Sequence, residues 1–120
     1  MICNLCPRRC GAERLPDRAG GVCAMPSLPV AARAMLHQWE EPCLVGEHGA
    51  GAVFFSGCNL RCKFCQNGII SQEGFGKTIS TERLREIFRE LVEQGAACLD
   101  LVTPTHFTDA VLEALGEERW

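Results

Sequence analysis

Three cysteines at short spacing, Cys58, Cys62 and Cys65, are the residues of this sequence most able to do chemistry. Their pattern is C-x3-C-x2-C, and eight residues fully extended would span roughly 27 Å. Three sulfurs can therefore meet at one centre only if the loop curls. Gly57 and Asn59 favour such curling, because both residue types tolerate unusual backbone angles. Clustered thiols in a chain without an export signal are more often metal ligands than disulfides, so the spacing predicts a metal or iron–sulfur centre.

The number of ligands in this loop indicates which centre it suits. Three thiolates on a four-iron cube leave one iron without a protein ligand, and an open position is typical of metal sites that do chemistry. That iron could take an amino and a carboxylate group from a bound small molecule. Structural zinc uses four ligands, so a zinc site would need His48, His106 or Cys43 as its fourth. Three cysteines cannot all pair with one another, which disfavours disulfides.

Four further cysteines, Cys3, Cys6, Cys10 and Cys23, lie near the amino terminus. Residues 1–29 are rich in Cys, Pro, Arg and Gly and show no apolar periodicity, which predicts loop-like chain without a core of its own. A structural metal would replace that core. Four thiols suit zinc or a second [4Fe-4S] cluster. Spacing alone does not separate these two, and free reduced cysteines are the third interpretation.

Composition and charge exclude several functional classes. The chain has 120 residues, nine of them cysteine, and a formal net charge of −3. This charge gives no basic footprint for nucleic acid or for an acidic membrane surface, and no apolar run approaches the ~20 residues of a membrane span. The amino terminus lacks the apolar stretch of a secretory signal. The expected location is therefore cytoplasmic.

The elements that must position the three-cysteine loop are a strand before it and a helix after it. The apolar run 52–56, bounded by glycines, predicts a strand buried on both faces. A helix is expected from Glu82, because apolar residues recur there at helical spacing. Thr81 is the expected N-cap and Gly95 the expected C-cap of this helix.

A second strand and helix are expected at 98–103 and 108–115, whereas 30–39 reads as a strand or a short helix. Strand, loop, helix, strand and helix in this order predict an α/β fold with a parallel sheet and right-handed crossovers. Two parallel strands do not make a sheet with both faces covered. We therefore expect the chain to be truncated or to be completed by a partner.

The loop and its flanks resemble the radical S-adenosylmethionine (SAM) superfamily. The stretch VFFSGCNLRCKFCQN (53–67), with an aromatic residue before the third cysteine, is similar to the activating-enzyme branch. LHQWEEPCLVG (36–46) and LVTPTHF (101–107) resemble one group within it, the proteins called pyruvate formate-lyase activating proteins. The resemblance covers nearly the whole chain. It implies the start of a partial (βα)6 barrel, about two βα units over 48–120, preceded by a cysteine-rich extension at 1–47.

The resemblance also implies an enzyme that generates a radical. Cys58, Cys62 and Cys65 would ligate three irons of a [4Fe-4S] cluster, SAM would chelate the fourth, and Phe64 would lie near the adenine of SAM. Reductive cleavage of SAM would give a 5′-deoxyadenosyl radical. The implied partners are a reductase or a flavodoxin- or ferredoxin-type electron donor, and a glycyl radical enzyme. The alternatives are a non-catalytic zinc or iron–sulfur module and an inactive fragment of the enzyme.

One stretch departs from the pattern of the family. Many members carry Gly-Gly-Glu at the end of the second strand, where the SAM amino group binds, and this chain has Thr103, Pro104, Thr105 and His106 there. Ligands bind at the carboxyl ends of parallel strands, so Thr103, Thr105 or His106 could accept hydrogen bonds from the SAM ammonium group. Threonine is equally an ordinary helix-cap residue. Both interpretations stay open, as do the substrate of the radical and the oligomeric state.

Overall fold

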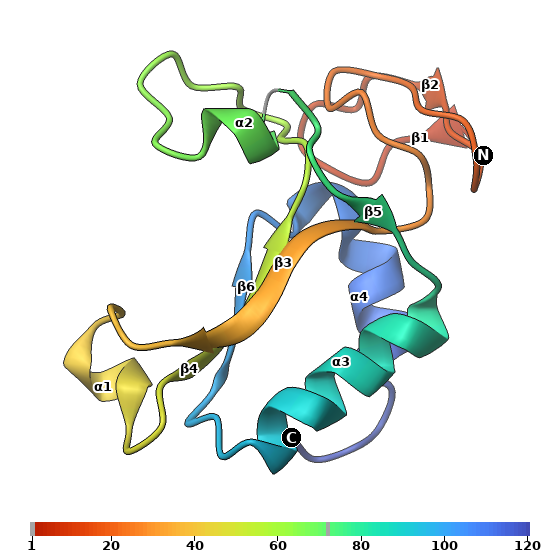
Figure 1. The fold of residues 1–120 in the computed structure, drawn as a ribbon. Helices are drawn as coiled ribbons and strands as arrows, with labels where there is room; N and C mark the ends of the chain where they lie inside the picture. Colours follow the sequence, from red (N-terminus) through yellow and green to blue (C-terminus); the bar gives the residue numbers. More distant parts are fainter. Residues whose placement is uncertain (1, 72) are drawn as a thin grey trace.

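A four-stranded mixed sheet forms the centre of the protein, whose computed structural model describes residues 2–71 and 73–120. The strand order is β5-β3-β4-β6 (Figure 1). β4 and β6 are parallel, whereas β3 is antiparallel to both of its neighbours. The predicted α/β class is confirmed in this mixed form. The strands are β3 (Val30–His37), β4 (Ala50–Phe55), β5 (Lys77–Thr78) and β6 (Leu99–Val102).

Helix α3 (Thr81–Glu93) lies between the parallel strands β4 and β6 in sequence, as predicted. The N-cap is Ser80, whose hydroxyl accepts a hydrogen bond from the backbone N–H of Arg83 at 3.1 Å. The predicted cap at Thr81 is wrong by one residue, because Ser80 keeps the extended backbone of a cap while Thr81 is already helical. The residues of α3 that are buried lie on one stripe, as expected: Leu84, Phe88 and Leu91.

The two longer helices cover one face of the sheet (Figure 1). α4 (Thr108–Leu115) follows the 3-10 turn η1 (Thr105–Phe107). Because side chains alternate along a strand, β4 sends two residues into the core and Phe54, between them, toward the other face, where Phe54 is half-buried. The core includes Val53, Phe55, Leu84, Phe88, Leu91, Phe107, Val111 and Ala114.

The segment 30–39, whose apolar pattern does not distinguish a strand from a helix, contains the strand β3. It pairs with β4 from Ala31 opposite Phe55 to His37 opposite Ala50, with an irregularity between Ala31 and Arg33. The expectation of a purely parallel sheet is therefore wrong, because this antiparallel pairing joins segments whose relative direction the sequence does not show. The division of the chain at 47/48 and the partial barrel stay predictions, and β3 and β4 pair across that division.

Residues 2–29 form an irregular segment near the end of the sheet where β4 stops (Figure 1). Its short strands β1 (Ile2–Cys3) and β2 (Ala12–Glu13) pair antiparallel. Two further helices of one turn each, α1 (Pro42–Val45) and α2 (Gly68–Ser71), were not predicted, because four residues are too few to show a period. No helix among the residues described is long and apolar enough to cross a membrane.

Candidate functional site

The three-cysteine loop begins directly after β4. The backbone N–H of Gly57 donates to the carbonyl oxygen of Ile70 at 2.9 Å, so the chain returns to the strand end after the third cysteine. Gly57 has a φ of 76°, and a Cβ atom there would lie 2.4 Å from the Cγ of Met25. Glycine is required at this position for its backbone angle and for the close approach of the amino-terminal segment.

The sulfur atoms of Cys58 and Cys65 have hydrogen-bond partners close to the loop. The backbone N–H of Leu60 donates to the Sγ of Cys58 at 3.3 Å, and the Oγ of Ser71 lies 3.3 Å from the Sγ of Cys65. The Ser71 hydroxyl and, after it, a backbone hydrogen bond from Asn67 lower the pKa of the Cys65 thiol. Donors around a sulfur favour the thiolate, which is the form that ligates iron.

The chemistry of this donor set fits an iron–sulfur cluster. Cys58, Cys62 and Cys65 are free thiols, each partly exposed, on one short loop. Within residues 2–71 and 73–120, no three His, Cys, Asp or Glu side chains are grouped so that they could hold one metal ion. Metal binding and ordering of the ligands are commonly one event. The three thiols are therefore candidate ligands of a cluster, and the described residues do not hold them in a preformed cage.

The residues considered as a fourth zinc ligand are either distant from the loop or buried. Cys43 and His48 precede β4 whereas the loop follows it, and a strand of six residues spans ~20 Å. His106 is 1% exposed, and its Nε2 lies 2.7 Å from the carbonyl oxygen of Ser56. None of these three residues therefore joins the loop as a fourth ligand in the part of the chain described.

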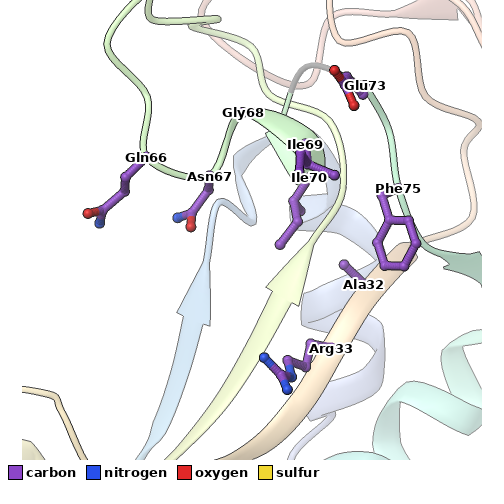
Figure 2. Close-up of a pocket in the computed structure, with 9 residues that line it drawn as sticks. All are labelled: Ala32, Arg33, Gln66, Asn67, Gly68, Ile69, Ile70, Glu73 and Phe75. Atoms are coloured by element: carbon purple, nitrogen blue, oxygen red, sulfur yellow. The ribbon is translucent and has the colours of Figure 1, made fainter.

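A groove opens beside the loop, on the side of the sheet that carries Phe54. A cavity of about 740 Å³ there and one of about 280 Å³ share Arg33, Asn67 and Ile70. Figure 2 shows Asn67 and Ile70, which follow Cys65 in the chain, facing Arg33 of β3. Arg33 forms no ion pair with any described residue. The volume of the larger cavity lies in the range of small-molecule sites.

The residues after β6 lie at the same end of the sheet as the loop. Thr103 is half-buried with a left-handed φ of 59°, and Thr105 is exposed at the start of η1. His106 is instead buried, and its Nε2–H donates to the carbonyl oxygen of Ser56, two residues before Cys58. Phe64 is 91% exposed on the loop. The fold brings His106 to the base of the loop, while Thr103 and Thr105 stay accessible.

The buried imidazole of His106 predicts a loss of stability in acid. Burial, aided by the nearby guanidinium of Arg14, lowers the pKa of His106 in the folded protein. The unfolded chain therefore takes up this proton first as the pH falls below about 6.5. Stability from His106 is thus complete above that pH and is lost below it. His106→Gln keeps a donor for Ser56 but does not titrate.

We expect the free energy of unfolding in urea to fall more between about pH 7.5 and 5.5 for the parent chain than for His106→Gln. Parallel decreases in the two proteins would show that His106 does not titrate in this window.

The four amino-terminal cysteines have different environments. Cys3 and Cys23 are buried, Cys6 is half-buried and Cys10 is exposed. Backbone hydrogen bonds from Ala12 and then Val22 lower the pKa of the Cys10 thiol. The four thiols are not grouped into a metal-binding arrangement in the described residues. A metal at this position stays a prediction.

Arg14 is a buried residue that no pattern in the sequence indicates. It is 1% exposed, and its guanidinium donates to the carbonyl oxygens of Met25 at 3.0 Å and His106 at 2.9 Å. It also donates to the carbonyl oxygen of Pro26 and contacts the Sγ of Cys3 at 3.3 Å. Arg14 thereby joins the amino-terminal segment to the turn η1 that follows β6. An arginine in a loop-like segment resembles surface charge until the contacts are known.

Comparison with known proteins settles the family. The radical SAM superfamily matches residues 52–118, which include the three-cysteine loop, α3, β6 and α4. The chain belongs to the radical SAM superfamily. An uncharacterized protein of Methanocaldococcus jannaschii is 42% identical over 77 residues, which are 64% of this chain and 21% of that protein. The chain thus spans about a fifth of the length of this relative. No solved structure matches significantly.

Radical SAM proteins generally use a [4Fe-4S] cluster and SAM, so membership indicates SAM-dependent radical chemistry. The match begins inside β4 and ends beyond α4, so all three loop cysteines and the strand end of β6 lie within it. Cys3, Cys6, Cys10 and Cys23 lie before the radical SAM match, which therefore says nothing about their ligand.

Proposed function

We propose that Cys58, Cys62 and Cys65 hold a [4Fe-4S] cluster and that SAM binds beside it. The observation that carries this proposal is the loop of three accessible thiols directly after β4, in a chain that belongs to the radical SAM superfamily. When bound and reduced, the cluster supplies the electron that cleaves SAM to methionine and a 5′-deoxyadenosyl radical.

The protein contributes the position and the charge state of the ligands. The hydrogen bond from Gly57 to Ile70 joins the two ends of the loop. Ser71 and Leu60 direct donors at sulfur, and hydrogen bonds to cluster sulfurs are one of the means by which proteins set its reduction potential.

The groove beside the loop is the proposed SAM site. Thr103 and Thr105, at the carboxyl end of β6, remain the proposed acceptors for the SAM ammonium group, in place of the carboxylate that this chain lacks. Phe64 is proposed to contact adenine, since an exposed aromatic ring gains by covering apolar surface. His106 already binds Ser56 through Nε2, so its proposed contribution is to hold the start of the loop.

The finer proposal follows the resemblance to the activating-enzyme branch. The radical would install a glycyl radical on a partner protein, with electrons from a reductase or a flavodoxin- or ferredoxin-type donor. The chain covers about a fifth of its relative, so further strand–helix units of a partial barrel would complete the site in a longer protein. The glycyl radical activity is therefore proposed for a longer protein that contains this chain. Binding and cleavage of SAM can be tested before the partner protein is known.

Anaerobic reconstitution with iron and sulfide tests the proposal. We expect a brown protein whose loop binds about four irons per chain. After reduction with dithionite, added SAM should change the electron paramagnetic resonance (EPR) spectrum, because one iron lacks a protein ligand. Cleavage to 5′-deoxyadenosine should follow where the chain supplies enough of the site. Bound zinc without visible absorbance, or a reduced cluster whose spectrum ignores SAM, would contradict the proposal and favour a structural metal module.

A further inference from the structure

We infer that Arg8, from the amino-terminal segment, is a positioning residue that holds the three-cysteine loop from outside. Its consequences for a cluster rest on the proposed function, whereas the contact itself does not. Arg8 and the loop are about 51 residues apart in sequence, so only the tertiary fold brings them together.

The guanidinium of Arg8 binds the backbone of the loop directly. Its Nε donates to the carbonyl oxygen of Asn59 at 2.6 Å, and its Nη2 lies 3.4 Å from that of Leu60. Both carbonyls lie between the first and second cysteines, Cys58 and Cys62. The planar fork of arginine suits two neighbouring oxygen acceptors, which lysine does not reproduce. Arg8 therefore restrains the backbone between Cys58 and Cys62. This backbone must bend if the three cysteine sulfurs are to meet at one cluster.

The amino-terminal segment that carries Arg8 is itself attached to the rest of the protein. Arg14 joins this segment to the backbone of His106 at 2.9 Å, and Met25 is buried against Gly57 at the start of the loop. Two attachments on the same segment, one to His106 and one to the start of the loop, keep Arg8 in place. An exposed side chain on an unattached segment would lose more entropy on binding.

The charge of Arg8 adds an electrostatic effect to this restraint. A cluster held by three thiolates gains a further negative charge when it is reduced, and a nearby cation stabilises that reduced form. Arg8 should therefore raise the reduction potential of the cluster. By restraining the loop, it should also slow the release of iron from the cluster.

The neighbouring residue Arg9 provides a matched control. Arg8→Gln and Arg9→Gln each remove one positive charge from adjacent positions, and no described contact joins Arg9 to the loop. In the metal-free full chain, hydrogen–deuterium exchange of the 58–65 peptide should become faster in Arg8→Gln and stay at the parent rate in Arg9→Gln. Arg8→Lys, which keeps the charge but not the fork, should exchange at an intermediate rate. Equal exchange in the two glutamine variants would overturn the inference.

The reconstituted protein gives a second readout. We expect Arg8→Gln to release iron to a chelator roughly tenfold faster than the parent, the effect of losing one charged hydrogen bond. Its EPR-monitored midpoint potential should shift to more negative values, while Arg9→Gln should show a smaller shift. Iron release at the same rate in both variants would also overturn the inference. A parent chain that binds no iron would instead refute the proposed function, and the exchange experiment would still decide the role of Arg8.

Discussion

Replacing Cys58, Cys62 and Cys65 together by alanine is expected to remove about four irons per chain from the reconstituted protein. The three thiols are free and partly exposed on a loop whose ends are joined by the Gly57 to Ile70 hydrogen bond. SAM-dependent changes in the EPR spectrum should disappear with the iron, because the cluster to which SAM would bind has lost its thiolate ligands. Iron analysis, visible absorbance and EPR measure the result.

The control for this variant is replacement of Cys43 and Cys98, which lie apart from the loop. Cys98 contacts the carbonyl oxygen of Leu44 at 3.6 Å, and burial and then Asp100 raise the pKa of its thiol, so it is poorly suited to ligate metal. The double variant should keep the full iron content. If the triple variant also kept it, the ligand assignment would be wrong.

Metal that remains in the triple variant reports on the amino-terminal site. Zinc or iron retained there and lost on further replacement of Cys3, Cys6, Cys10 and Cys23 would identify the metal that four thiols alone do not specify.

Replacing Arg14 by methionine is expected to lower the free energy of unfolding by about 3 kcal/mol. The guanidinium is 1% exposed and donates to the carbonyl oxygens of Met25, Pro26 and His106. It also lies 5.5 Å from the ring centre of Phe107. Methionine keeps the apolar stem but leaves those buried acceptors without their donor. Urea unfolding of the metal-free full chain measures the change.

Arg18→Met is the matched control, because Arg18 is an arginine of the same segment on the surface. Its side chain is 61% exposed and pairs with Glu13 at 2.7 Å, so its loss should cost less than about 1 kcal/mol. Similar small losses for both variants would show that the buried contacts of Arg14 do not stabilise the fold.

The parts of the fold predicted correctly are those specified by local pattern. The run 52–56 overlaps β4, which begins two residues earlier and ends one residue earlier, because glycines bound an apolar stretch too short for a helix. The helix 108–115 matches α4 in both bounds. α3 shows its buried stripe in the sequence, and its two caps, Ser80 and Gln94, each lie one residue before the predicted position. Each of these signals arises within a window of about fifteen residues.

The parts that could not be predicted depend on contacts between distant segments. β3 shows no decisive period because Arg33, Ala34 and Met35 mix exposed and half-buried positions on a strand near the sheet edge. His106 was a candidate acceptor for the SAM ammonium group, and only its burial against Ser56 shows that its ring is engaged within the protein. No local pattern in the sequence predicts that Arg14 is buried.

The sequence by itself determined the donor chemistry of this protein, because three thiols at C-x3-C-x2-C spacing lie within eight residues of one another in any fold. The resemblance of the surrounding residues indicated the radical SAM superfamily, to which the chain belongs. The tertiary structure alone decided that β3 runs antiparallel to β4, that Arg14 is buried and that Arg8 reaches the loop. Spacing constrains residues that are near in sequence, whereas these contacts depend on how distant segments pack.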